Sequence, residues 1–217
     1  MAMANTKFLI LAVALVTAGF SAAAEPSEIS WAELAPPQTI IEDPFAELST
    51  EQLEALRTIL RYESSKNKSN SHITAERAEN LRNQLADEGL DVEWLFERRE
   101  TIIQKRHAQS TAVNEKVIGT EVRIPGYVLP LEFDGQKVTS FVLVPYAGAC
   151  IHTPPPPANQ MVHVSYPDGI EVSGLFTPVW IEGKMRAEYS TQDVGLSDGE
   201  ARVEVGYGMS AKNVFSY

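Results

Sequence analysis

The chain has a single cysteine, few histidines and a shortage of basic residues. Because Cys150 is the only cysteine among 217 residues, an intramolecular disulfide is excluded and the fold must be stabilised by burial. The 18 lysines and arginines are outnumbered by 29 aspartates and glutamates, so the formal net charge is −11. Such a chain lacks the basic surface that a nucleic acid or an anionic lipid surface attracts. We therefore expect no nucleic-acid partner.

The chain also lacks an apolar run long enough to span a bilayer comfortably. The longest run, 8–20, follows Lys7 and ends at Ser21-Ala22-Ala23-Ala24 before Glu25. A short apolar run with small residues at positions −3 and −1 is typical of a cleaved secretory signal. We predict a signal peptide over 1–24 and a mature, periplasmic or secreted protein that starts at Glu25. No stable membrane anchor is expected after the signal is removed.

The first half of the mature chain has the pattern of an arm followed by helices. Residues 25–48 are predicted to be an irregular arm, in which Trp31 and Leu34 either dock the arm on the body or belong to a mobile segment. Residues 49–115 form a predicted helical region with apolar stripes at helical spacing. The predicted helices cover 50–63, with a Ser49/Gln52 capping box, then the stretch from Thr74 to Gly89, and 92–109, capped by Asp91.

The second half, 116–217, changes to the period of a β-strand. Strands are predicted at 122–131, 138–146, 161–166, 179–189 and within 201–217, with turns at Asp134-Gly135 and Pro167-Asp168-Gly169. Prolines in the first strand indicate an edge, bend or bulge, and Asp193, Asp198 and Glu200 are read as a solvated loop. The predicted fold class is α+β, with a short helical N-terminal region followed by a small antiparallel β-barrel of oligonucleotide/oligosaccharide-binding type.

The most distinctive segment starts at the lone cysteine and includes four consecutive prolines. Because prolines fix φ and remove backbone donors, this segment is expected to be a stiff loop. Its candidate binding residues are Cys150, His152, Pro154, Pro155, Pro156, Pro157, Asn159 and Gln160.

Several readings of this loop stay open. Cys150 and His152, two residues apart on one strand face, are candidate ligands for a divalent metal such as zinc, although two ligands do not complete a zinc site. A simple hairpin register would place Cys150 opposite Val162 and turn His163 to the other face. The other readings are a buried thiol, a thiol-dependent enzyme using Cys150 with His152, and a docking surface formed by the prolines.

Three segments resemble a known family. Val122–Glu132, Phe141–Tyr146 and Cys150–Gln160 are similar to the exported bacterial family called domain of unknown function 3299, and Trp31–Leu34 is similar as well. The resemblance implies a periplasmic protein without an established activity, some of whose relatives are encoded beside ABC-transporter components. We therefore expect an exported, non-enzymatic accessory or binding protein linked to an envelope transport or metal-handling system, with transporter components as partners.

Overall fold

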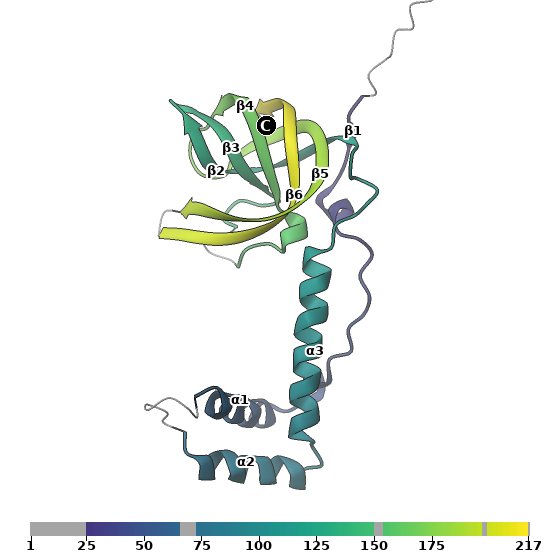
Figure 1. Cartoon of the computed structure of the whole chain (residues 1–217), viewed down its shortest axis with the longest axis vertical. Helices are drawn as coiled ribbons and strands as arrows, with labels where there is room; N and C mark the ends of the chain where they lie inside the picture. The colour runs from purple at the N-terminus through teal and green to yellow at the C-terminus, as the bar shows by residue number, and fades with distance from the viewer. Residues whose placement is uncertain (1–24, 66–72, 150–153, 197–198, 217) are drawn as a thin grey trace, which may run out of the picture.

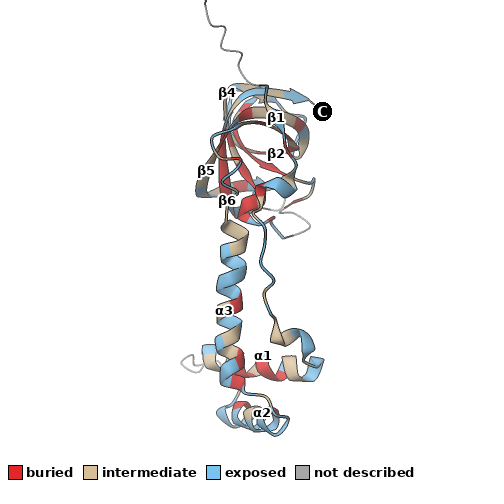
Figure 2. Ribbon diagram, turned by 90° about the vertical axis from the view of Figure 1, so that its right-hand side faces the viewer, coloured by how far each residue is buried: buried red, intermediate tan, exposed pale blue. Residues whose placement is uncertain are grey.

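A helical unit and a sheet unit lie at the two ends of one long helix (Figure 1). The computed structural model describes residues 25–65, 73–149, 154–196 and 199–216. The helices are α1 (Thr50–Ser65), α2 (Ala75–Asp87) and α3 (Val92–Thr111). At 20 residues, α3 is about 30 Å long, and most of its surface between the two units is exposed (Figure 2).

The helices begin at the residues that the sequence indicated. Ser49 and Gln52 form the expected capping box, with the Ser49 N–H donating to Gln52 Oε1 at 2.9 Å and the Gln52 N–H donating to Ser49 Oγ at 3.2 Å. The side chains of Thr74 and Asp91 cap α2 and α3. In the described ranges, no helix has the length and apolar content needed to cross a membrane.

Six strands follow one another along the chain and pair in one sheet of mixed direction. They are β1 (Ser27–Glu28), β2 (Glu121–Asp134), β3 (Lys137–Val144), β4 (Val162–Glu171), β5 (Thr177–Leu196) and β6 (Gly199–Ser216). The prediction of a purely antiparallel sheet is wrong, because β1 runs parallel to β2 and β4 runs parallel to β6. Since β2 also pairs with β5, the pairings of β2, β3, β4, β6 and β5 make a closed circuit.

The interior of this circuit is lined by residues at alternate strand positions. Phe141, Val162, Val164 and Ile181 are fully buried in it. A second apolar cluster, which includes Val142 and Val144, lies against the outer part of the β5–β6 hairpin and is also fully buried. Val142, Val144, Val162 and Val164 are thus all fully buried, in two different clusters.

Two segments that were predicted to be a turn and a loop lie within the strands as described, although the first of them still breaks the pairing of β4 with β3. Pro167-Asp168-Gly169 does not end β4, which continues to Glu171 with a register shift against β3. Asp193 and Glu200 lie in β5 and β6, not in a loop, and Asp198 lies outside the described residues. β5 and β6 continue through this region because Val194, Val203 and Val205 bury their side chains in the second apolar cluster.

The turn and the bulge expected around β2 are confirmed. Asp134 pairs with Lys137 across a two-residue turn, in which Gly135 takes a φ of 61°. Shifts in register between Pro130 and Phe133 mark the bulge. β2 is nonetheless no edge strand, because it pairs with β3 and β5.

The N-terminal arm is docked on the sheet. It contains β1 and two short 3-10 helices, η1 (Trp31–Leu34) and η2 (Pro44–Glu47). Leu34 is fully buried in the sheet core, and the Trp31 indole N–H donates to the Pro125 carbonyl at 2.7 Å. Of the two readings of Trp31 and Leu34, docking is therefore confirmed.

Candidate functional site

The second half of the predicted binding loop lies where the helical unit meets the sheet. Cys150 and His152 fall outside the described residues. Pro154, Pro155 and Pro157 are exposed, whereas Pro156 and Asn159 are buried. The described part of the loop, 154–160, therefore presents three prolines to solvent and buries Pro156, Ala158 and Asn159.

Asn159 holds the C-terminal end of α3. It lies in the short 3-10 helix η3 (Ala158–Gln160) and is 1% exposed. Its Nδ2 donates to the Gln109 carbonyl at 2.8 Å and to the Ala112 carbonyl at 2.9 Å. These carbonyls belong to the last turn and cap of α3, where partners within the helix run out. The two N–H groups of the Asn159 amide are thus bonded to the backbone of the chain itself.

Gln160 and Gly206 fix η3 between the arm and β6. The Gln160 Nε2 donates to the Trp31 carbonyl at 2.9 Å. A Cβ at Gly206 would lie 2.9 Å from the Ala158 carbonyl oxygen, so β6 needs glycine there for η3 to pack so closely. The proline segment is consequently anchored on the sheet, the arm and α3 at once.

The exposed prolines stand between two open grooves. One groove has a volume of about 590 Å³ and runs along the arm and the segment after α3; the other has about 480 Å³ and runs along β5 and β6. Pro157 lines both grooves, and both volumes fall in the range of ligand-binding clefts. The residues that line the second groove are Ser110, Pro155, Pro156, Pro157, Ala158, Met161, Thr191, Arg202, Val203 and Glu204.

The hairpin register considered for this loop placed Val162 opposite Cys150, which lies outside the described residues, and Val162 is already paired on both sides. Val162 pairs with Leu143 of β3 on one side and with Tyr207 of β6 on the other, so neither side of Val162 is left for a further strand. Within the described residues, no three His, Cys, Asp or Glu side chains are grouped closely enough to hold a metal ion.

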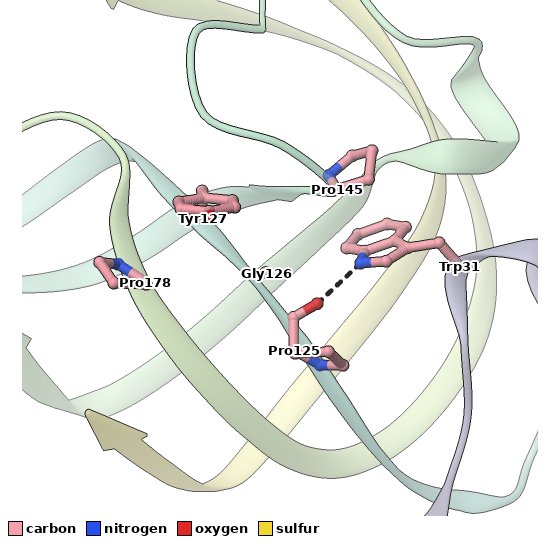
Figure 3. Close-up of a pocket in the computed structure, with 6 residues that line it drawn as sticks. All are labelled: Trp31, Pro125, Gly126, Tyr127, Pro145 and Pro178. Carbon is pink, nitrogen blue, oxygen red and sulfur yellow. Dashed lines mark hydrogen bonds between the residues drawn. The ribbon is translucent and has the colours of Figure 1, made fainter. Parts of the chain in front are cut away.

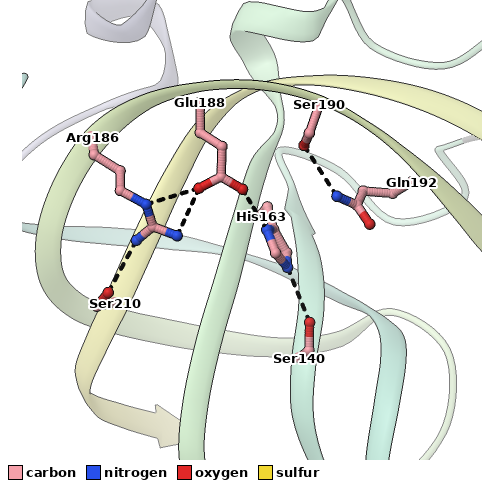
Figure 4. Close-up of polar contacts among 7 residues, drawn as sticks. All are labelled: Ser140, His163, Arg186, Glu188, Ser190, Gln192 and Ser210. Carbon is pink, nitrogen blue, oxygen red and sulfur yellow. Dashed lines mark hydrogen bonds and ion pairs between the residues drawn. The ribbon is translucent and has the colours of Figure 1, made fainter.

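A polar relay that the sequence did not predict crosses the outer face of the sheet (Figure 4). The His163 Nε2 lies 3.0 Å from Ser140 Oγ, and its Nδ1 lies 2.7 Å from Glu188 Oε1. Arg186 donates from Nε to Glu188 Oε2 at 2.8 Å and from Nη1 to Ser210 Oγ at 3.0 Å. The relay joins side chains from β3, β4, β5 and β6.

The charges in this relay hold Glu188 ionised. Burial acts to raise the pKa of Glu188, but the hydrogen bonds from His163 and Arg186 and their positive charge outweigh burial, so the pKa lies below its usual range. The ionised Glu188 accepts a hydrogen bond from His163 Nδ1, and the donor in the contact between His163 Nε2 and Ser140 Oγ depends on the tautomer of the ring.

The order of contacts is that of a serine–histidine–acid relay, but the setting differs from an acyl-transfer site. Such a site also needs donors directed at the position of the oxyanion. Ser140 lies inside the sheet, paired with Glu132 of β2 and Ser165 of β4, and is only 8% exposed. The relay therefore supports the sheet by bridging four strands. Sequence spacing gave no signal for it, because Ser140 and Glu188 are 23 and 25 residues from His163.

A small pocket lies beside the docked arm (Figure 3). It has a volume of about 230 Å³ and is lined by the side chains of one tryptophan, one tyrosine and three prolines and by one glycine: Trp31, Tyr127, Pro125, Pro145, Pro178 and Gly126. The indole N–H of Trp31 donates to the Pro125 carbonyl, so this donor is already used within the chain. The pocket is formed only when the arm is docked.

Comparisons with known proteins agree on a family. The family model described as "Protein of unknown function (DUF3299)" matches residues 31–216. The chain is similar to a solved DUF3299 family protein from Pseudomonas aeruginosa PAO1, with 27% identity, coverage of 89% of this chain and 97% of that chain, and a TM-score of 0.47. It is also similar to the OBody AM3L09 bound to hen egg-white lysozyme, with 14% identity, coverage of 49% and 90%, and a TM-score of 0.29. No curated protein matches the chain.

Proposed function

The chain belongs to the DUF3299 family, whose function is unknown, and we propose a function from the geometry of its own residues. We propose that it is an exported, non-enzymatic accessory or binding protein of an envelope transport system. Its partner, a component of the transporter, binds the surface formed by Pro154, Pro155 and Pro157. The closed circuit of strand pairings, with β4 parallel to β6, supports a small barrel of oligonucleotide/oligosaccharide-binding type as the scaffold.

The observation that carries the proposal is the placement of the exposed prolines between two grooves on an anchored segment. Asn159 and Gln160 fix the segment to α3 and the arm. Pro157 has φ −60° and ψ 152°, the polyproline conformation. A segment held in this way loses little conformational entropy when it binds, so more of the contact energy becomes affinity.

The test separates the exposed prolines from the buried one. We would replace Pro154, Pro155 and Pro157 with serine and keep Pro156, because Pro156 is buried and its loss would weaken the fold. Captures from envelope extracts with the wild type and the variant as bait are then compared by mass spectrometry. We expect transporter components to be enriched by the wild type and lost with the variant, at nearly unchanged melting temperature.

A matched control replaces an exposed proline elsewhere. Pro167 lies in β4, and we expect Pro167→Ser to retain the partner. Equal enrichment by the wild type and the triple variant, or the absence of any transporter component with both, would show that this surface is not the binding site.

Metal handling is a second part of the proposal, because Cys150 and His152 supply a thiol and an imidazole just before the proline segment. The test is the zinc content of the protein purified without chelator, compared with the Cys150→Ala, His152→Ala double variant. We expect zinc in the wild type only, and retention that falls with falling pH as both ligands take up protons. Equal zinc content in the two proteins would remove the metal from the proposal.

A further inference from the structure

A pocket in the helical unit has an apolar floor and a basic rim. It has a volume of about 240 Å³ and lies between η2, α1 and α3. Its floor is made by Phe45, Leu53, Leu56, Leu60 and Phe96. Leu56 is buried in the helical core, and Phe45 and Phe96 pack partly buried against that core. The floor of the pocket is thus the solvent-facing side of the apolar cluster that holds the described helices together.

The rim carries positive charge in an acidic protein. Arg57, Arg99 and Arg106 line the pocket, and Asp43 is the one acidic residue that lines it. Asp43 pairs with Arg106 at 2.6 Å. Arg57 is paired with Glu54 at 3.3 Å, but both side chains are more than half exposed, so this contact is weak and easily exchanged. Two guanidinium groups beside an apolar floor are therefore available, in a chain of net charge −11.

We propose that this pocket binds a protein segment in which an apolar side chain is flanked by carboxylates. Its volume is below the range of small-molecule clefts and fits one anchoring side chain. Arg57 and Arg99 pair with the carboxylates beside the anchor, since a guanidinium matches a carboxylate in a bidentate geometry. The complementary charge selects acidic segments over basic ones.

This site is separate from the proline surface. The two share no lining residue: the pocket contacts α3 between Phe96 and Arg106, and the groove beside the prolines contacts α3 at Ser110. A protein with both sites can hold two partners, or two parts of one partner, at a fixed separation. The inference does not depend on the function proposed for the proline segment.

The experiment uses the full mature chain and two synthetic peptides. In one peptide a central Phe-Leu pair is flanked by glutamates, and in the other the same pair is flanked by lysines. Binding is measured by fluorescence anisotropy at low and high salt. We expect the glutamate peptide to bind and the lysine peptide not to bind, with affinity falling as salt screens the rim charges.

Charge-reversal variants locate the binding. We expect Arg57→Glu with Arg99→Glu to weaken binding of the glutamate peptide about tenfold or more. The control, Arg77→Glu with Lys184→Glu, makes the same change in net charge at exposed positions outside the pocket and should leave binding unchanged. Because all four positions are on the surface, melting temperatures should stay close to the wild type.

Three results would overturn the proposal. They are equal binding of the two peptides, equal weakening by the pocket variant and the control, and no binding of either peptide. Binding of phosphatidylglycerol vesicles that is lost with the pocket variant, without peptide binding, would assign the pocket to a membrane surface instead.

Discussion

Asn159 should be the residue whose loss most clearly separates the helical unit from the sheet. Its amide is 1% exposed and donates to two carbonyls at the end of α3. An unsatisfied buried acceptor costs about 1–3 kcal/mol. Gln109 and Ala112 are half-buried, so water replaces part of the loss. For Asn159→Ala we expect the free energy of unfolding to fall by about 2 kcal/mol.

The isosteric variant Asn159→Asp gives a stronger and more diagnostic effect. Its carboxylate would face the same two carbonyl oxygens without a proton to donate, and a buried charge without a partner costs about 3–5 kcal/mol. As the pH is lowered, the carboxyl takes up a proton and regains one donor. The loss of stability relative to the wild type should therefore shrink in acid.

The assay is urea unfolding of residues 25–217, followed by circular dichroism at several pH values. Asn80→Ala, at an exposed position of α2, is the control and should stay within about 0.5 kcal/mol of the wild type. If Asn159→Ala and Asn159→Asp also stay within that range, or if the effect of Asn159→Asp does not depend on pH, the role assigned to Asn159 is incorrect.

Three further predictions concern other parts of the chain. Because the folded-state pKa of Glu188 is lowered, its ionised form stabilises the protein above the unfolded-state pKa of about 4.3, and this contribution is lost as the pH falls through the lower folded-state value. Glu188→Gln should therefore lower the free energy of unfolding by about 1–3 kcal/mol at pH 7, and this difference from the wild type should disappear in acid. A difference in urea unfolding that does not change with pH would contradict the relay. Trp31→Phe removes the hydrogen bond to Pro125 and should lower the free energy of unfolding by about 1 kcal/mol; an unchanged urea midpoint would contradict docking through the indole. Mass spectrometry of the exported protein should give Glu25 as the first residue, and an intact Met1 form would refute cleavage of the signal peptide.

Local signals in the sequence were sufficient to locate most elements. The capping residues Ser49, Thr74 and Asp91 fixed the starts of the helices, because each makes its contact within three residues. Asp134-Gly135 fixed the β2–β3 turn for the same reason. Alternating apolar residues identified the buried positions of the strands.

Contacts between distant segments could not be predicted in this way. The parallel pairing of β4 with β6 joins Val162 to Tyr207, and no local pattern specifies it. The outer half of the β5–β6 hairpin was read as a loop from its acidic residues, because the strands against which Val194, Val203 and Val205 pack are far away in the sequence. Asn159 and Gln160 were predicted to bind a ligand, and the sequence did not show that their amides donate to carbonyls of α3 and of the arm.

The hydroxyl of Tyr207 has a consequence for the order in which the chain folds. It accepts from the Asn114 N–H at 2.6 Å and donates to the carbonyl of Leu34, which is 173 residues away. The arm, the segment after α3 and the last strand meet at this one oxygen atom. A growing chain that still lacks β6 has neither this contact nor the parallel partner of β4, so the arm then has only its contacts with β2, through β1 and through Trp31. The docking of Leu34 is thus completed only when the last strand of the chain is in place.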